Sequence, residues 1–236
     1  MAYTRQQLKQ DKFAETAKET VSWAVEHQRT LATASIAGLV ALVIAAGGWI
    51  YYNQRDQAAG TEIGAALRTY EAPISPASAQ KTDYLTFPTA KERAVAARNA
   101  FQQVQDKYPH TRAAEVARYF VGVTSLDMGD TAGAENALQQ VAGYRNQDLA
   151  ALGKFALASV YRAENKDADA IRIYQELAAR PSATVPKSTA QLELAELYLQ
   201  KGQNQDAVKL YTEIQKQDVA SPAAQTASRR LLSVKP

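Results

Sequence analysis

An uncharged stretch near the amino terminus constrains this chain more than any other feature. Residues 30–54, TLATASIAGLVALVIAAGGWIYYNQ, contain no charged side chain and lie between Arg29 and Arg55. As a helix this stretch would rise about 37 Å at about 1.5 Å per residue, against a hydrocarbon core of about 30 Å. A helix buried in a soluble domain seldom needs so long an uncharged run. We therefore predict one transmembrane helix over residues 30–54.

The ends of this span carry residues that are typical of the membrane–water interface. Aromatic rings near its carboxyl end favour the headgroup layer, and an arginine closes each end. The predicted interface anchors are Arg29, Trp49, Tyr51, Tyr52 and Arg55. A cleaved signal peptide is the main alternative, because it also begins with a basic segment. The apolar run and the 29 residues before it are both longer than such a peptide normally has, which favours the span.

Charge sets the expected orientation of the span. Residues 1–29 hold five Lys and Arg against four Asp and Glu, and short basic segments beside a span tend to stay in the cytoplasm. We therefore predict a cytoplasmic tail and a larger domain on the opposite side of the membrane. Residues 4–28 have the pattern of an amphipathic helix, which either lies at the interface or docks on a membrane partner.

The composition of the rest of the chain excludes several classes of function. The net charge is +3, and residues 55–236 hold 22 basic and 20 acidic side chains, so nucleic acid is not an expected partner. The chain has no cysteine, and its two histidines, His27 and His110, are far apart in sequence. Disulfides and thiolate or multi-histidine metal sites are therefore excluded. Since no glycine motif for phosphate binding or nucleophilic catalysis occurs, we predict no enzyme activity, metal or cofactor.

A helical pattern continues beyond the span to about residue 72, and a loop follows it. Pro73, Pro76 and Pro88 break the chain there, and the segment is too long and too rich in Pro and Ser to be packed core. A new helix is expected at Thr89, whose hydroxyl can cap the first turn while Glu92 reaches back toward it.

From this point the chain repeats itself. Four alanines are spaced 37, 36 and 37 residues apart, and each is followed four residues later by a larger apolar residue. The alanines are Ala97, Ala134, Ala170 and Ala207, and the larger residues are Phe101, Leu138, Tyr174 and Tyr211. Gly129, Asn165 and Gly202 precede the last three alanines by five residues, and these residue types tolerate a left-handed turn.

Each of the last three units is therefore predicted to be a helix, a tight turn and a second helix. The first helices are expected at about 113–127, 149–163 and 188–201, the second at about 131–142, 167–179 and 204–216, and a capping helix at 221–232. One such pair cannot bury its own apolar face, so neighbouring pairs must stack. We predict an all-α fold in which a single transmembrane helix is followed by a curved solenoid.

The pattern resembles tetratricopeptide repeats. Small residues stand in the first helices at Gly122, Ala158 and Ala195, and Tyr161 and Tyr198 follow three residues later, although Ser125 departs from the aromatic pattern. The predicted organisation is a cytoplasmic amphipathic tail (1–29), a transmembrane helix (30–54), a connecting helix with a Pro-rich loop (55–88) and a tetratricopeptide-like repeat domain with its capping helix (89–236).

The resemblance implies that the first helices line a concave groove that binds proteins. The candidate groove residues are Tyr119, Val123, Leu126, Phe155, Arg162, Leu192 and Leu199. Family members that clamp a terminal carboxylate carry Lys and Asn where this chain has Tyr119, Phe155 and Leu192, so that mode is not expected. An apolar groove suits extended or helical segments of other proteins. The alternative is that neighbouring helices, the 73–88 loop or the C-terminal helix cover these residues.

The order of tail, span and irregular repeats resembles the YfgM family, the ancillary subunit of the SecYEG translocon in Gram-negative bacteria. This resemblance implies a single-pass inner-membrane protein with a cytoplasmic amino terminus and a periplasmic repeat domain. The implied partners are the SecYEG translocon, periplasmic chaperones or translocated client proteins. The alternative is a structural scaffold or assembly subunit of another inner-membrane envelope complex.

Overall fold

The computed structural model describes residues 23, 27–75, 85–217 and 221–234. Within them the regular elements are helices, which confirms the predicted all-α class. The helices are α2 (Gln28–Glu71), α3 (Ala90–Lys107), α4 (Arg112–Asp127), α5 (Thr131–Ala142), α6 (Gln147–Ala163), α7 (Asp167–Ala179), α8 (Lys187–Gln200), α9 (Asn204–Gln217) and α10 (Pro222–Ser233). The predicted tail helix at 4–28 lies almost entirely outside the described residues.

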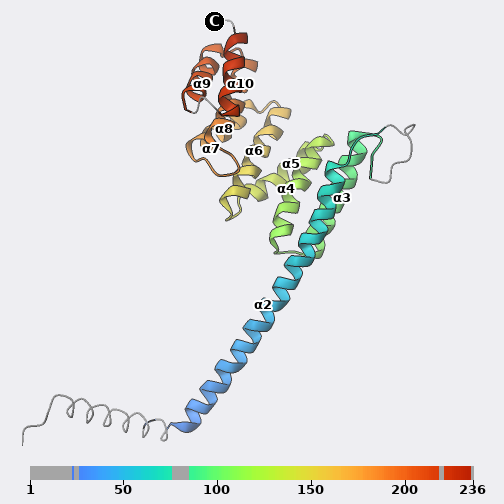
Figure 1. The fold of residues 1–236 in the computed structure, drawn as a ribbon, viewed down its shortest axis with the longest axis vertical. Helices are drawn as coiled ribbons and strands as arrows, with labels where there is room; N and C mark the ends of the chain where they lie inside the picture. Colours follow the sequence, from blue (N-terminus) through green and yellow to red (C-terminus); the bar gives the residue numbers. More distant parts are fainter. Residues whose placement is uncertain (1–22, 24–26, 76–84, 218–220, 235–236) are drawn as a thin grey trace, which may run out of the picture. The chain divides into compact units, whose positions relative to one another are not determined.

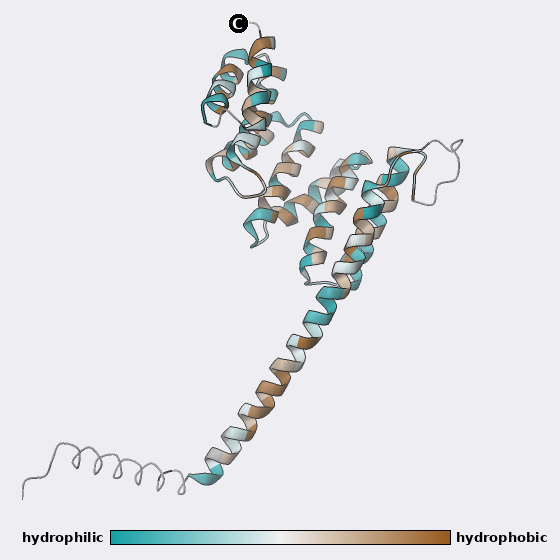
Figure 2. Ribbon diagram, viewed as in Figure 1, coloured by the Kyte–Doolittle hydropathy of each residue, from teal (hydrophilic) through white to brown (hydrophobic). Residues whose placement is uncertain are grey.

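The chain divides into two compact units, one ending at Gln54 and the other beginning at Arg55. The described part of the first unit is the apolar half of α2, which Figure 2 colours as a hydrophobic run. An 18-residue window of this helix has a mean hydropathy of 2.0 and none of it is buried. The helix is therefore long and apolar enough to cross a membrane, because its side chains need an apolar surrounding that the protein does not supply.

The second unit begins with a helix pair that a long loop connects. Residues 55–71 of α2 lie beside α3 (Figure 1), and Ala59 and Ala66 pack with Ala97 and Phe101 in one core cluster. The ends of the loop are tied together, since Ser75 N donates to Phe87 O at 2.9 Å. The loop thus interrupts the sequence pattern of the first repeat, but the two helices still pair as they do in the later repeats.

A polar cluster fastens α2 to the end of α3. Glu62 forms an ion pair with Lys107, and the hydroxyl of Tyr108 donates to the same carboxylate oxygen at 2.9 Å. Arg55 donates to the backbone carbonyl of Lys107 and lies over the Tyr108 ring at 5.9 Å from its centroid. These contacts pack residues 55–71, which were predicted to form a connecting helix, against the end of α3.

The three later pairs, which Figure 1 shows as labelled helices, have bounds close to the predicted ones. They are α4 with α5, α6 with α7, and α8 with α9. The turns within them contain left-handed residues at the predicted positions, with φ of +83° at Gly129, +60° at Asn165 and +73° at Gly202. A left-handed residue lets the chain reverse within one turn, which sets the second helix antiparallel to the first.

Small side chains allow the paired helices to approach closely. Ala97, Ala134, Ala170 and Ala207 are all completely buried. At Gly122 on α4 even a methyl group would not fit, because its Cβ would lie 2.5 Å from Leu138 Cγ on α5. The larger residue that follows each alanine fills the core between units, and α10 covers the last pair through the buried Ala227.

Candidate functional site

The predicted groove residues all lie on the first helices of the repeat units. Tyr119, Val123 and Leu126 are on α4, Phe155 and Arg162 on α6, and Leu192 and Leu199 on α8. Every one of these seven side chains is half-buried. They are similarly exposed because of their spacing along the helices. Each lies on a helix face that is next to the face packed on the second helix of its unit.

The structure brings five of these seven residues together in two groups. Tyr119, Leu126 and Phe155 pack against a core cluster that runs from α5 to α8. Leu192 and Leu199 pack against a separate cluster of α8, α9 and α10. The apolar surface of the first helices is therefore divided between two packing centres.

Arg162 on α6 joins two neighbouring repeats. It donates to Glu193 Oε2 on α8 at 2.7 Å and to Gln200 Oε1 at 3.2 Å. Both the cation and the carboxylate are partly shielded from water, which strengthens their attraction relative to a fully exposed pair. This ion pair makes the middle of the predicted apolar groove polar.

A second charged network lies further along α8. Glu196 accepts a hydrogen bond from the Tyr211 hydroxyl at 2.8 Å and pairs with Arg230 Nε on α10 at 2.6 Å. Burial raises the pKa of Tyr211, and the adjacent Glu196 carboxylate raises it further. The tyrosine therefore stays a neutral donor that fixes the carboxylate, and α10 is held by charge as well as by apolar packing.

An aromatic cluster stands at the amino-terminal end of the same surface. Phe101 and Phe120 are stacked with ring centroids 4.7 Å apart, and Tyr70 meets Phe120 edge-on at 5.4 Å. Tyr119 contacts Phe120 edge-on at 5.2 Å. Burial raises the pKa of Tyr119, and the proximity of Tyr70 adds to the shift. Burial also raises the pKa of Tyr70, so both phenols are neutral in the physiological range.

The predicted groove positions did not include Tyr70 or Glu193. Tyr70 continues the apolar pattern of α2, so treating residues 55–71 as the first helix of a repeat would have found it. Glu193 and Glu196 lie three residues apart on α8, and their partners come from α6, α9 and α10. A single helix pattern gives no sign of those partners.

The predicted membrane anchors fall on both sides of the unit boundary. Arg29, Trp49, Tyr51 and Tyr52 belong to the first unit and are exposed there. Arg55 belongs to the second unit, where its guanidinium packs on Tyr108. The anchoring role of all five residues stays a prediction.

The described residues contain no group of three or more His, Asp and Glu side chains that could hold a metal ion. The two charged networks instead join carboxylates to arginine and tyrosine partners on neighbouring helices. Such arrangements fix the packing of neighbouring helices.

Comparison with protein families agrees with this architecture. The family model described as a tetratricopeptide repeat-like domain matches residues 29–179, and a tetratricopeptide repeat model matches residues 192–223. Neither the curated proteins nor the solved structures gave a match to the chain. The first model covers the whole of the first helix pair and more than half of the sequence. The chain therefore belongs to the tetratricopeptide repeat-like domain family.

Proposed function

We propose that this protein is a membrane-anchored interaction module that assists translocated polypeptides beside the Sec translocon. The main observation in support is that the same chain contains tetratricopeptide-like repeats and a helix that is apolar enough to cross a membrane. Repeats of this family serve generally as protein-interaction modules. The resemblance of the whole architecture to the YfgM family supports the translocon assignment, an inner-membrane anchor and a periplasmic repeat domain.

The surface of the first helices fits this role in its chemistry. Tyr119, Phe155 and Leu192 recur at intervals of 36 and 37 residues, and each leaves part of an apolar side chain exposed. Contacts with such half-buried groups are individually modest, since full burial of an apolar side chain contributes about 1.5–3 kcal/mol before ordering costs. Binding is therefore expected to be weak and tolerant of sequence. In this proposal the protein has no catalytic role.

Site-specific photocrosslinking in intact membranes tests the proposal. A benzoylphenylalanine at Phe155 or Tyr119 preserves an aromatic ring at each position, and the exposed Gln103 on α3 supplies the control site. We expect adducts with newly translocated polypeptides at the two aromatic positions and few at the control. Equal adduct yields at all three positions would show that the surface of the first helices does not bind the translocated polypeptides specifically.

A scaffold subunit of another inner-membrane complex is the second candidate. The ion pairs of Arg162 with Glu193 and of Glu196 with Arg230 favour it, because they give this surface fixed charges that suit a permanent partner. In that case the crosslinks at Phe155 would go to one stoichiometric protein and would persist after protein synthesis is blocked. Client adducts should disappear under the same block, so one experiment separates the two functions.

A further inference from the structure

A second surface, built between the second helices of successive units, has features of a ligand site. Arg118 on α4 and Lys154 on α6 are 36 residues apart and so occupy equivalent places in neighbouring repeats. Each lines a hollow bounded by second helices. None of the predicted groove residues lines these hollows, so this surface is distinct from the one described above.

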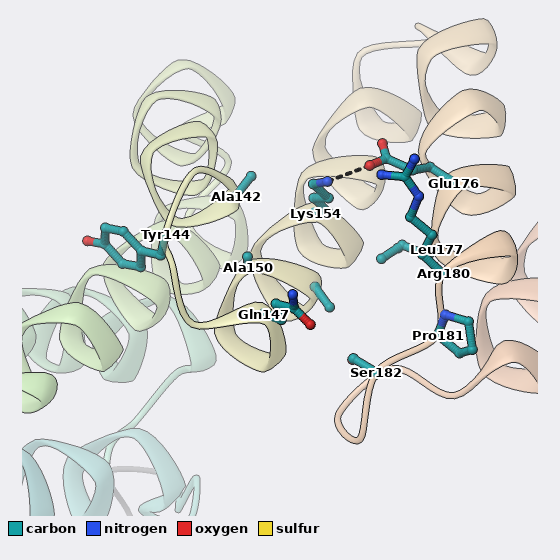
Figure 3. A pocket seen from close by; sticks show the side chains of 11 residues that line it. Ala142, Tyr144, Gln147, Ala150, Lys154, Glu176, Leu177, Arg180, Pro181 and Ser182 are labelled. Atoms are coloured by element: carbon teal, nitrogen blue, oxygen red, sulfur yellow. Dashed lines mark hydrogen bonds and ion pairs between the residues drawn. The ribbon is translucent and has the colours of Figure 1, made fainter.

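The hollow at Lys154 has an apolar floor and a charged rim. It has a volume of about 300 Å³ and is floored by Ala142, Ala150 and Ala151. Figure 3 shows Lys154 of α6 and Glu176 of α7 facing each other across it, with Nζ and Oε1 2.5 Å apart. The floor residues are too small to fill the space between the helices, which leaves it open.

One wall of this hollow is the segment that joins α7 to α8, and it is held in place. Ala183 N donates to Asp148 Oδ1 at 3.0 Å, and the Thr184 hydroxyl donates to the Asp148 backbone carbonyl at 2.7 Å. The wall is thereby tied to the start of α6. A ligand would meet a preformed surface and would not have to order this segment on binding.

The rim of the Lys154 hollow carries more positive than negative charge. Lys154 and Arg180 both line it, and Glu176 is the single carboxylate in the lining. Within the described part of the chain, the ion pairs leave Arg180 without a carboxylate partner. A guanidinium presents several donors in a plane that matches a carboxylate, so this end of the surface favours an acidic group.

Two adjoining hollows at Arg118 share Gln105 and Arg118 and have volumes of about 210 and 290 Å³. Arg118 donates to Gln105 Oε1 at 2.8 Å and to the Tyr144 hydroxyl at 3.0 Å. In the described structure the other amide atom, Gln105 Nε2, is buried and donates to no acceptor. Buried donors without an acceptor are uncommon in folded proteins, and the Gln105 side chain that carries this one lines both hollows.

The two ends of this surface differ in the chemistry that they accept. Glu115 lines one of the Arg118 hollows and repels a carboxylate there. The amide side chains of Gln102, Gln105, Asn136 and Gln140 line that end and match the donors and acceptors of a peptide backbone. Tyr144 lines hollows at both ends and connects them.

We propose that this surface binds an extended acidic segment of another polypeptide. The segment places its backbone against the amides at Gln105 and Arg118, and it passes Tyr144. It then sets an acidic side chain against Arg180 and Lys154. This surface and the first-helix surface lie on different residues, so the protein can hold a partner and a client together.

Peptide binding to the full-length protein in detergent micelles tests the proposal. The probe is a fluorescein-labelled decapeptide of Gly and Ser with three consecutive glutamates, followed by fluorescence anisotropy. A matched peptide with three glutamines controls for charge. We expect the glutamate peptide to bind at least tenfold more tightly than the glutamine peptide, and we expect added salt to weaken it.

Two variants locate the site. Arg180→Gln should weaken binding of the glutamate peptide at least fivefold. Arg172→Gln removes another exposed arginine, on α7 and outside the lining of the hollow, and should leave binding unchanged. Gln105→Glu keeps the acceptor for Arg118 but removes the unpaired donor. This variant should weaken the binding of both peptides without lowering the melting temperature of the protein.

Several results would overturn the proposal. Equal affinity for the two peptides would remove the acidic recognition, and equal effects of the Arg180 and Arg172 variants would place binding elsewhere. Displacement of the peptide by phosphatidylglycerol vesicles or by single-stranded DNA, with tighter binding of the competitor, would assign the surface to another class of ligand. Failure of the photocrosslinking experiment would leave these measurements unaffected.

Discussion

Replacing Gly122 by alanine should destabilise the repeat domain, although alanine favours helix formation. Gly122 is buried on α4, and an added Cβ would lie 2.5 Å from Leu138 Cγ and 2.8 Å from Leu138 Cδ2 on α5. Leu138 is itself completely buried, so it has little room to move away. Helices α4 and α5 would have to separate, or Leu138 would have to leave its rotamer.

The expected free-energy change is the balance of two effects. Overpacking a well-packed core costs about 1–3 kcal/mol, whereas the exchange of a helical glycine for alanine contributes about 0.8–1 kcal/mol of stability. We therefore expect a net loss of up to about 2 kcal/mol for Gly122→Ala. Since each kcal/mol shifts the melting temperature of a domain of this size by about 2–4 °C, the loss is measurable.

Gly60 supplies the matched control, because it lies in α2 and nothing comes within 4 Å of an added Cβ there. Gly60→Ala should raise the melting temperature by about 1–4 °C through helix propensity alone. Thermal unfolding of the full-length protein, followed by circular dichroism in detergent, compares the two variants. If Gly122→Ala raised the melting temperature as much as Gly60→Ala, the close approach of α4 and α5 would be wrong.

Three further outcomes are expected. Ala170→Leu should lower stability by about 1–3 kcal/mol, because this fully buried alanine has no room for a larger side chain, and an unchanged melting temperature would refute the helix contact. A hydrogen bond from Lys107 lowers the pKa of the Glu62 carboxyl from its ordinary value of 4.5, so the stability that it contributes is present above that value and is lost as the pH falls through the depressed pKa. The melting temperature of Glu62→Gln should therefore decline less between pH 5 and pH 3, and parallel curves would contradict this role. Because the chain has no cysteine, single cysteines at Thr20 and Ser233 test the topology. A membrane-impermeant thiol reagent should label only Ser233→Cys in spheroplasts, and the reverse result would invert the predicted orientation.

Local rules in the sequence predicted most of the helix boundaries. Thr89 caps α3 through its side chain, which accepts from Glu92 N at 3.1 Å, as the capping pattern indicated. Gly129 and Gly202 adopt the left-handed conformation that the spacing before each second helix required. These features depend on residues within one or two turns of each other, so a single sequence contains the information that specifies them.

These local rules could not predict that residues 55–71 of α2 pair with α3. Residues 55–71 and α3 are separated by a loop that has no repeat pattern, yet Ala59, Ala66 and Phe101 share one core. Residues 55–71 could either extend into solvent as a connecting helix or pack their apolar face on a neighbouring helix. That choice depends on the shape of α3 and α4, which the pattern of α2 does not specify.

The sequence alone determined the uncharged span, the repeat period and the placement of small residues, because each is a property of spacing along one chain. Only the tertiary structure decided that Arg162 pairs with Glu193 and that Tyr211 and Arg230 share Glu196. The physical reason is the strong distance dependence of charge and hydrogen-bond interactions. Residues tens of positions apart acquire partners only when stacking of the helix pairs brings them within a few ångströms.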